Sequence, residues 1–354
     1  MLLFLKIQQE HNQNATAVLL TGANGFLGSH LLYELLTETE FNIYCLVRNE
    51  KRLLDAIQYY FGNGFYQRHQ EKIHCIEGDV SLPGLNISRE IKSKIGAVYH
   101  AAASTKHYGE FSESFRVNTL GTRHVVDFCA EIGAELHHVS TASVSGLGFV
   151  NVDYNEQSKP YFTENDLEIG QHYEDNIYIH SKLLAEKIVL SAIEKGMDAY
   201  IYRVGNLTER FSDGVYQMNN ENNAFMIRER AIRKLGAISP AFHSFIFEKT
   251  PIDLCAKAIL ALSKHTHQDH VFHVFNPNAL NGYDYYRGIF PDLKEVTDEE
   301  WFSMLDKEAE KDTSCAVMRA YVKNLLAVSV PIETKCDITL KALEKCGFQW
   351  QEKE

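Results

Sequence analysis

The sequence predicts an α/β protein with a Rossmann-like, doubly wound parallel sheet and a smaller, mostly helical C-terminal domain. Two observations lead to this prediction. Short apolar runs typical of buried strands alternate with helical patterns five times within about 140 residues. The first such unit, residues 18–36, joins its strand to its helix through a turn with three evenly spaced glycines. Beyond residue 206 the regular alternation ends, which predicts a second structural unit.

The overall composition narrows the class of protein. The 354-residue chain is 45% hydrophobic and 23% charged, which is ordinary for a globular enzyme. Its net charge of −12 argues against broad nucleic-acid binding. The apolar start at residues 1–5 is too short for a signal peptide or a membrane-spanning helix. Seven cysteines, an odd number without a Cys-x-x-Cys pair, predict a reduced, disulfide-free protein of the cytoplasm.

The first strand and helix carry a candidate dinucleotide site. After the strand at residues 18–20, Gly22, Gly25 and Gly28 follow at three-residue intervals. Such a turn lets backbone N–H groups approach a pyrophosphate at the positive end of the helix. The spacing is Gly-x-x-Gly-x-x-Gly rather than Gly-x-Gly-x-x-Gly, so a strand–turn–helix with chance glycines remains the alternative.

The ends of the next two strands indicate which cofactor is preferred. Residues 42–48 are predicted as the second strand, which ends in Arg48 rather than in the acidic residue usual for NAD. A guanidinium suits the 2′-phosphate of NADPH, and a solvated basic turn is the alternative. Residues 72–80 are predicted as the third strand. Near its end, Asp79 is placed to accept a hydrogen bond from the adenine amine, with a simple turn cap as the alternative.

Three further strands complete the predicted sheet. They cover residues 97–103, 136–141 and 198–206. Helices over residues 112–132 and 177–195 connect them. The small side chains of Ala101, Ala102 and Ala103 leave room for a flat cofactor against the backbone.

The C-terminal half shows less regular patterns. It contains a basic helix at residues 226–235, a helix ending at Ser263, a late strand at residues 271–275, and acidic, amphipathic helices from residue 297. We therefore expect a dinucleotide-binding domain over residues 14–206, with residues 246–263 packing back on it. A C-terminal subdomain over residues 207–354 completes the expected division.

Tyr178 and Lys182 form the second chemical signal. Four residues apart, they occupy one face of the helix that follows the fifth strand. A neighbouring ammonium and a bound pyridinium both favour the phenolate, so we expect a lowered pKa for Tyr178. The hydroxyl-bearing pair Ser140 and Thr141 ends the preceding strand. By itself a Tyr-x-x-x-Lys pattern is common by chance.

Taken in chain order, these motifs resemble those of the extended short-chain dehydrogenases/reductases over residues 17–263. The motifs are Thr21-Gly22-x-x-Gly25-x-x-Gly28, Gly78-Asp79-Val80, His100-Ala101-Ala102-Ala103, Asn118, Ser140-Thr141 and Tyr178-x-x-x-Lys182. Within that superfamily the chain is most similar to thioester reductases, which include the terminal reductase domains of nonribosomal peptide synthetases and the reductase part of carboxylic acid reductases. Residues 44–48, 78–88, 139–144 and 202–208 carry this closer similarity.

The resemblance implies a reaction and a set of roles. NADPH would give hydride to the carbonyl carbon of an acyl or peptidyl thioester, presented by a carrier protein on phosphopantetheine. Thr141 and Tyr178 would hold the oxyanion, and Lys182 would tune Tyr178 and bind the ribose. The product would be an aldehyde, or an alcohol after a second reduction. No metal is required, and a monomeric domain is expected.

The motifs and the resemblance together assign two groups of residues. The catalytic residues are Thr141, Tyr178 and Lys182. The cofactor-binding residues are Thr21, Gly22, Asn24, Gly25, Phe26, Leu27, Gly28, Arg48, Asp79, Val80, Ala101, Ala102, Ala103, Asn118, Tyr178, Lys182, Val204 and Asn206. Asn118 is either the holder of a proton-relaying water or a buried polar group of the helix.

Other readings of the function remain open. The enzyme is alternatively a reductase or epimerase of the same superfamily acting on a free small molecule or an acyl-CoA. In a different class, it is a non-catalytic protein that senses NADP(H). The acyl group, two- or four-electron reduction, and a free-standing or multidomain context are not decided by these residues.

Several local features also have two interpretations. The polar residues 150–175 form a flap over the acyl channel or an inert insertion. The basic run Arg228, Arg230, Arg233 and Lys234 binds an acidic carrier protein or the phosphopantetheine phosphate, or is a solvated helix face. Histidines 265, 267, 270 and 273 are a metal site or an ordinary loop. The aromatic residues Tyr283, Tyr285, Tyr286, Phe290 and Trp301 line an acyl pocket or fill a core.

Overall fold

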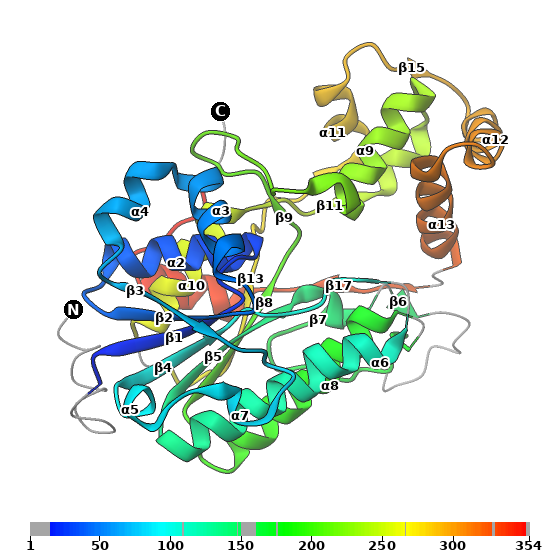
Figure 1. The fold of residues 1–354 in the computed structure, drawn as a ribbon. Coiled ribbons are helices and arrows are strands. Elements are labelled where there is room, and N and C mark those ends of the chain that lie inside the picture. The colour runs from blue at the N-terminus through cyan, green and yellow to red at the C-terminus, as the bar shows by residue number, and fades with distance from the viewer. Residues whose placement is uncertain are drawn as a thin grey trace.

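A seven-stranded parallel sheet is the centre of the molecule (Figure 1). The computed structural model describes residues 15–107, 110–146, 148–149, 161–174, 176–265, 267–327 and 330–351. The strand order is β13-β8-β5-β4-β1-β2-β3. The strands are β1 (Ala17–Thr21), β2 (Asn42–Val47), β3 (Ile73–Glu77), β4 (Ile95–His100), β5 (Glu135–Thr141), β8 (Ala199–Val204) and β13 (Val271–Val274). This order confirms the predicted doubly wound fold, and its direction reverses between β1 and β4.

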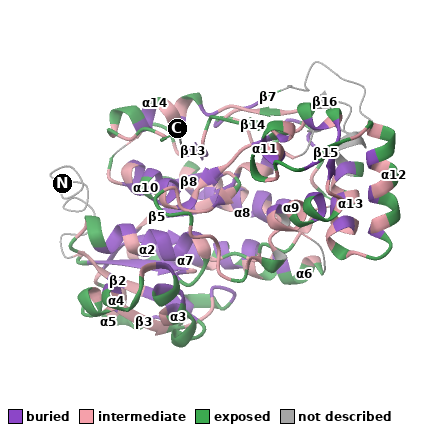
Figure 2. Ribbon diagram, turned by 90° about the horizontal axis from the view of Figure 1, so that it is seen from above, coloured by how far each residue is buried: buried purple, intermediate pink, exposed green. Residues whose placement is uncertain are grey.

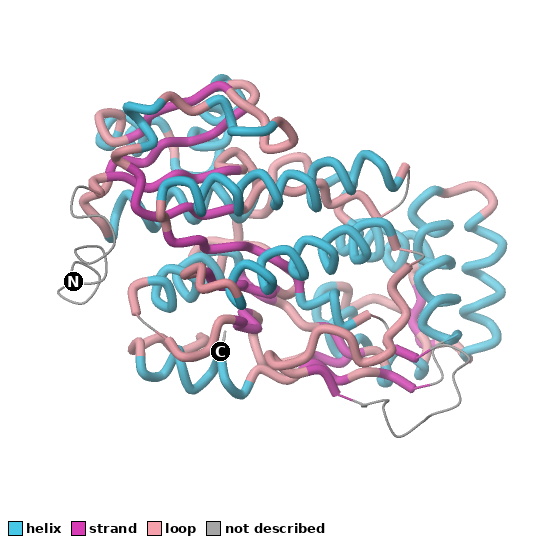
Figure 3. Tube along the Cα trace, turned by 90° about the horizontal axis from the view of Figure 1, so that it is seen from below, coloured by secondary structure: helices cyan, strands magenta, loops and turns pink. Residues whose placement is uncertain are grey.

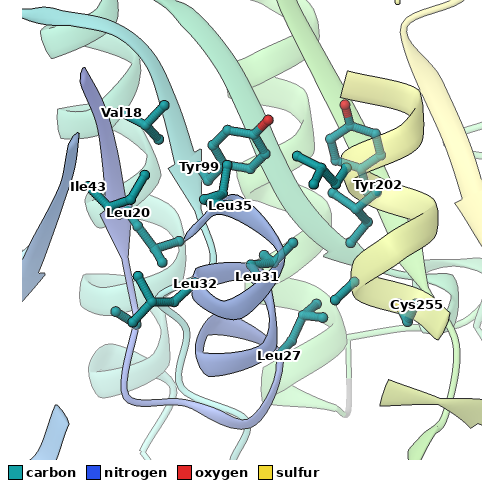
Figure 4. Close-up of a cluster of buried hydrophobic side chains, with 14 of the residues drawn as sticks. Val18, Leu20, Leu27, Leu31, Leu32, Leu35, Ile43, Tyr99, Tyr202 and Cys255 are labelled. Atoms are coloured by element: carbon teal, nitrogen blue, oxygen red, sulfur yellow. The ribbon is translucent and has the colours of Figure 1, made fainter. Parts of the chain in front are cut away.

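Both faces of the sheet are covered by helices because successive side chains of each strand point to opposite sides. Val18 and Leu20 of β1 join one apolar core with helix α2 (Figure 4), whereas Leu19 joins the core on the other face of the sheet. The first face carries α2 (Phe26–Glu38), α3 (Glu50–Phe61), α4 (Asn63–His69), α10 (Ile252–Ser263) and α14 (Asp337–Lys345). The other face carries α5 (Arg89–Lys92), α6 (Phe111–Ser114), α7 (Gly121–Ile132) and α8 (Ile177–Glu194), and the long helices α7 and α8 cross it in Figure 3.

The helix expected over residues 112–132 is interrupted. A π-helical segment, η2 (Phe115–Leu120), separates α6 from α7. Within this segment Asn118 and Thr119 are buried and donate to Ser181 of α8, at 2.9 Å each. The wider turn thus directs two polar side chains at the neighbouring helix, which hydrophobic periodicity does not reveal.

A smaller helical part lies to one side of the sheet layer (Figure 1). Its helices are α9 (Ala224–Leu235), α11 (Gly282–Ile289), α12 (Asp298–Ala309) and α13 (Thr313–Ala327). They surround their own core, in which Trp301 is fully buried and its indole N–H donates to the Ala237 carbonyl oxygen at 3.0 Å. Figure 2 shows buried residues in both parts.

The C-terminal range of the chain contributes to both parts of the molecule. Strand β13 lies at the edge of the main sheet, and Ala342 and Leu343 of α14 pack in the core beneath α10. In chain order, segments of the sheet layer therefore both precede and follow the helices of the helical part. The domain boundary at residues 206 and 207 stays a prediction.

Short elements connect the larger ones. Pairs of two-residue strands join β10 (Ala237–Ile238) with β15 (Lys294–Glu295), β11 (Ile246–Phe247) with β14 (Leu280–Asn281), β12 (Thr250–Pro251) with β9 (Leu207–Thr208), β16 (Val330–Pro331) with β6 (Gly148–Phe149), and β17 (Glu333–Thr334) with β7 (Tyr161–Phe162). The 3₁₀ turns are η1 (Pro83–Asn86), η3 (Ala142–Ser145), η4 (Asn220–Asn222) and η5 (Pro240–Ser244). Across the described residues, no helix has the length and apolar character needed to cross a membrane.

Candidate active site

The glycine turn between β1 and α2 is packed so closely that side chains are excluded. Gly22 has a φ of +72°, and a Cβ there would lie 2.6 Å from the backbone nitrogen of Ala102. At Gly28 a Cβ would lie 2.0 Å from the Gly22 carbonyl oxygen. The glycines therefore allow the turn to press against the end of β4 and the helix to start directly on the turn.

The first turn of α2 is arranged to receive an anion. Its N-cap is Gly25, no side chain caps the helix, and its first turn has no acidic residue. Asn24 and Gly25 are exposed at the tip of the turn, and no side chain bonds to the first amide groups of the helix. A cradle without side chains at the positive end of a helix fits the pyrophosphate of a dinucleotide. Leu27 is buried in the core, which leaves only its backbone available to a ligand.

The side chain of Phe26 contributes to an aromatic wall beside this turn. Its ring lies 5.9 Å from that of Tyr60 and 5.8 Å from that of Tyr216. Tyr216 belongs to the segment after β9, so the wall joins residues from distant parts of the chain. Sequence reasoning did not identify this wall.

Arg48 and Asp79 lie just beyond the ends of neighbouring strands. Arg48 is exposed after β2, and the Asp79 carboxylate after β3 accepts from the Ser81 backbone N–H at 2.8 Å. Burial favours the neutral carboxyl, but hydrogen bonds from Ser81 and the charge of Arg48 outweigh it and lower the pKa of Asp79. Asp79 therefore caps its own turn, and its contact with adenine stays a prediction. Val80 is buried and packs next to Gly121.

The Thr21 side chain links β1 to the end of β4 by hydrogen bonds. Its hydroxyl lies 2.8 Å from His100 Nδ1 and accepts from the Ala102 N–H at 3.2 Å. Thr21 is fully buried. Its side chain thus sets the spacing where the strand order reverses between β1 and β4. The partly exposed Ala101 and Ala102 and the exposed Ala103 follow along the edge where a cofactor would lie.

Thr141 and Tyr178 meet at the carboxyl edge of the sheet. Thr141 ends β5, Tyr178 lies in the first turn of α8, and their side chains are close enough for the Thr141 hydroxyl to lower the pKa of Tyr178. The Thr141 hydroxyl also accepts from the Ser143 N–H at 3.1 Å, which fixes its rotamer. Burial raises the pKa of Tyr178 to about 12, against the effect of the Thr141 hydroxyl. In the protein alone, burial of the phenol therefore dominates its pKa, and the lowering expected with a bound pyridinium stays a prediction.

Two residues that sequence reasoning missed hold Tyr178 in place. The Asn176 carboxamide oxygen caps α8 by accepting from the Tyr178 and Ile179 N–H groups, at 3.1 and 3.2 Å. Its amide nitrogen lies 3.1 Å from His107 Nδ1, and the His107 ring packs edge-on against Tyr178 with centroids 5.1 Å apart. An asparagine just before an apolar helix is a recognisable cap signal, whereas His107 comes from the distant β4–α6 loop and carries no such signal.

Lys182 lies one turn further along α8 and is buried. Its ammonium donates to the Val139 carbonyl oxygen at 2.7 Å and lies 3.3 Å from His138 Nε2. Burial lowers the pKa of Lys182 to about 8, while the negative charge of Glu186 raises it. Burial also holds the pKa of His138 well below its usual value, so His138 is neutral and accepts from the ammonium.

Comparison with known proteins identifies the family. A model of the NAD-binding family described as male sterility protein matches residues 20–259. The chain belongs to this family. In sequence it is 29% identical over 327 residues to one protein of the linear gramicidin synthase of Brevibacillus parabrevis, covering 88% of this chain. The chain spans only 6% of the length of that synthase protein.

Solved structures of reductase domains resemble this member of the male sterility protein family along nearly its whole length. A thiolation-reductase di-domain from an archaeal nonribosomal peptide synthetase is 32% identical with a TM-score of 0.82, over 99% of this chain and 76% of that chain. The terminal R domain from the myxalamid PKS-NRPS biosynthetic pathway is 26% identical with a TM-score of 0.79, over 94% and 86%. These relatives confirm the resemblance seen in the motifs, and the chain has the NAD(P)-binding fold of an oxidoreductase.

In this member of the male sterility protein family, a buried ion pair links helix α8 to strand β8. The Glu186 carboxylate accepts from Arg203 Nη2 at 2.7 Å and from its Nε at 3.0 Å, and both side chains are almost fully buried. Ser140, the neighbour of Thr141, donates to the same carboxylate. Glu186 follows Lys182 by one helical turn, so it was recognisable as a neighbour on the same face. Its partner Arg203 comes from β8, and the sequence spacing did not indicate that these two side chains would meet.

Asn118, Val204 and Asn206 are the remaining residues predicted to bind the cofactor. Asn118 accepts from the Ser104 N–H at 2.7 Å and donates to the Ser104 carbonyl and to Ser181 Oγ, at 2.9 Å each. These bonds tie the loop after β4 to α8, and the relay role of Asn118 stays a prediction. Val204 is buried, and Asn206 is exposed with its N–H donating to the Glu248 carboxylate at 2.5 Å. Burial raises the pKa of Glu248 to about 7.

The clustered histidines and the aromatic residues of the C-terminal half have structural contacts of their own. His265, His267 and His270 each bond to a different backbone carbonyl, at 2.9 Å. No metal-binding group of three or more His, Cys, Asp or Glu side chains occurs within the described ranges. The aromatic residues at 285, 286 and 301 are buried in the core of the helical part.

The insertion over residues 150–175 lies partly outside the described residues, which exclude 150–160 and 175. Its remaining part is anchored to the sheet layer: β7 pairs with β17, Phe162 is buried, and Gln171 donates to the Val144 carbonyl oxygen at 3.0 Å.

Proposed function

We propose that the protein catalyses the NADPH-dependent reductive release of a peptidyl or acyl thioester from a carrier protein, as an aldehyde or an alcohol. One observation carries the proposal: the side chains of Tyr178 and Thr141 meet at the carboxyl edge of the sheet on which the glycine turn also opens. Homology to reductase domains of nonribosomal peptide synthetases supports the choice of a thioester as substrate.

The chain's own residues supply proton transfer and charge stabilisation. NADPH, when bound in the glycine cradle, supplies the hydride. Tyr178 keeps its proton at neutral pH because burial raises its pKa to about 12, so its hydroxyl donates to the oxyanion that develops on the thioester carbonyl. Thr141 donates a second hydrogen bond, and the buried Lys182 ammonium is available to the nicotinamide ribose. Collapse of the resulting thiohemiacetal releases the thiol and the aldehyde.

The preference for NADPH over NADH rests on Arg48. An exposed guanidinium at the end of β2 is suited to a 2′-phosphate. A 2′-hydroxyl carries no charge and would interact with the guanidinium far more weakly. Asp79 lies close enough for the charge of Arg48 to lower its pKa, which supports assigning both side chains to the adenosine end of the cofactor.

The proposed partner is a carrier protein with a phosphopantetheine-linked thioester. The archaeal relative is a di-domain in which a thiolation domain accompanies the reductase, and we carry that arrangement over to this chain as part of the proposal. We also propose a monomeric, cytoplasmic enzyme. Its seven cysteines are all free thiols, which suits a reducing compartment.

The test compares substrates by NADPH oxidation and by mass analysis of the products. Acyl thioesters on a carrier protein, on pantetheine and on coenzyme A are each offered with NADPH, beside a sugar nucleotide. Oxidation with the carrier-bound thioester and release of an aldehyde or alcohol is the expected result. No oxidation with any thioester, together with turnover of the sugar nucleotide, would disprove the proposal. Binding of NADPH with no turnover at all would instead favour a sensor.

A further inference from the structure

The side chain of Arg228 on α9 is held by three aromatic rings. Its guanidinium carbon lies 4.3 Å from the ring centroid of Tyr321, 5.3 Å from that of Phe225 and 5.6 Å from that of Phe247. Cation–π contacts of this kind restrict the guanidinium to one orientation without neutralising its charge.

Arg228 also lacks the partners that such a charge usually has. Its Nε is buried and makes no hydrogen bond, and no acceptor or carboxylate partner for its guanidinium occurs among the described residues. By contrast, Lys249 of the neighbouring linking segment is paired with Glu209 at 3.0 Å. A half-buried, unpaired arginine in a chain with a net charge of −12 is a feature that folding alone does not require.

The position of Arg228 relates it to the catalytic tyrosine and to the glycine turn. Burial is the main cause of the lowered pKa of His107, and the charge of Arg228 lowers it further. His107 is the residue whose ring packs against Tyr178. Burial raises the pKa of Tyr216, and the charge of Arg228 lowers it in part. The Tyr216 ring lies beside that of Phe26. Arg228 thus reaches, from the helical part, toward the two residues that border the catalytic tyrosine and the cofactor turn.

The other members of the basic run on α9 behave differently. Arg230 is exposed and donates to the Glu221 carbonyl oxygen, Arg233 is exposed, and Lys234 lies 3.7 Å from the Glu308 carboxylate. These three side chains form a solvated helix face, which was one of the two interpretations of the run. Arg228 alone of the four is enclosed by aromatic rings.

We propose that Arg228 binds an anionic oxygen group of the substrate, either the phosphate of the pantetheine arm or a carboxylate on the acyl chain. The inference rests on the proposed thioester-reducing function and adds to it a recognition site on the helical part. A planar guanidinium presents parallel N–H donors that match both phosphate and carboxylate oxygens. The aromatic enclosure orients these donors before the substrate arrives, which reduces the entropy lost on binding.

The experiment measures binding to the NADP⁺-loaded protein by equilibrium dialysis, with two matched pairs of probes, because the oxidised cofactor cannot reduce a thioester probe. The first pair is 4′-phosphopantetheine and pantetheine, which differ by the phosphate. The second pair is succinyl-pantetheine and butyryl-pantetheine, which differ by a carboxylate. The wild type should bind the anionic member of one pair at least about tenfold more tightly than the neutral member. The pair that shows this difference identifies the source of the anion.

Arg228→Gln should abolish that difference, and Arg228→Lys should retain only part of it. Arg230→Gln, which removes the same charge from the same helix, should leave it unchanged. Melting temperatures establish that each variant is folded. A wild type without preference for either anionic probe, or an Arg228→Gln variant that keeps the preference, would overturn the inference. Absence of thioester turnover by the wild type is a separate result, which would instead overturn the proposed function.

Discussion

Replacing Glu186 by glutamine tests the role of the buried ion pair between helix α8 and strand β8. The side-chain exposure is 0% for Glu186 and 1% for Arg203, and the shortest contact between them is 2.7 Å. Glutamine keeps the size of the side chain but removes its charge, which leaves the Arg203 guanidinium buried without compensation. Breaking such a pair costs about 3–5 kcal/mol of unfolding free energy. Loss of the Glu186 charge also removes the effect that raises the pKa of Lys182.

Urea denaturation of wild type and Glu186→Gln measures the loss of stability. Glu168→Gln is the matched control, because Glu168 pairs with Lys187 of the same helix at 2.8 Å but the side chains are 48% and 40% exposed. That surface pair should contribute at most about 1 kcal/mol. If Glu186→Gln were no more destabilising than Glu168→Gln, the buried pair would not be supporting the helix, and the reasoning would be refuted. Where the variant is folded, its activity should decline at lower pH than that of the wild type.

Four further outcomes are expected. Gly28→Ala should destabilise the fold by about 1–3 kcal/mol, as seen by melting temperature, because the added Cβ would lie 2.0 Å from the Gly22 carbonyl oxygen. Arg48→Ala should raise the Kd for NADPH about 10–100-fold and leave that for NADH nearly unchanged; an equal loss for both would refute the 2′-phosphate contact. Tyr178→Phe should lower kcat about 10²–10⁴-fold with NADPH binding intact, and unchanged turnover would remove Tyr178 from the mechanism. Reduction should decline as pH rises through about 8, since burial lowers the pKa of Lys182 to about 8 and the neutral amine loses its charge; a flat profile to pH 10 would contradict this.

The chemistry-bearing motifs were accessible from the sequence because their information is local. A strand, three glycines and a helix are adjacent in the chain, and Tyr178 and Lys182 share a helical face by their spacing alone. Asn176 could have been predicted as a helix cap in the same way, because it directly precedes an apolar helix. By contrast, the π-helical segment around Asn118 depends on contacts with α8, and so periodicity predicted one continuous helix there.

The sequence by itself determined the doubly wound fold, the position of the glycine turn and the family of the chain, since strand alternation and motif spacing are properties of neighbouring residues. Only the tertiary structure decided the environment of the reacting groups. It places Tyr178 in surroundings that raise its pKa in the protein alone, and it brings Arg203 to Glu186 and Arg228 toward His107. Burial and pairing between distant segments depend on how strands and helices pack, and no spacing along the chain encodes them.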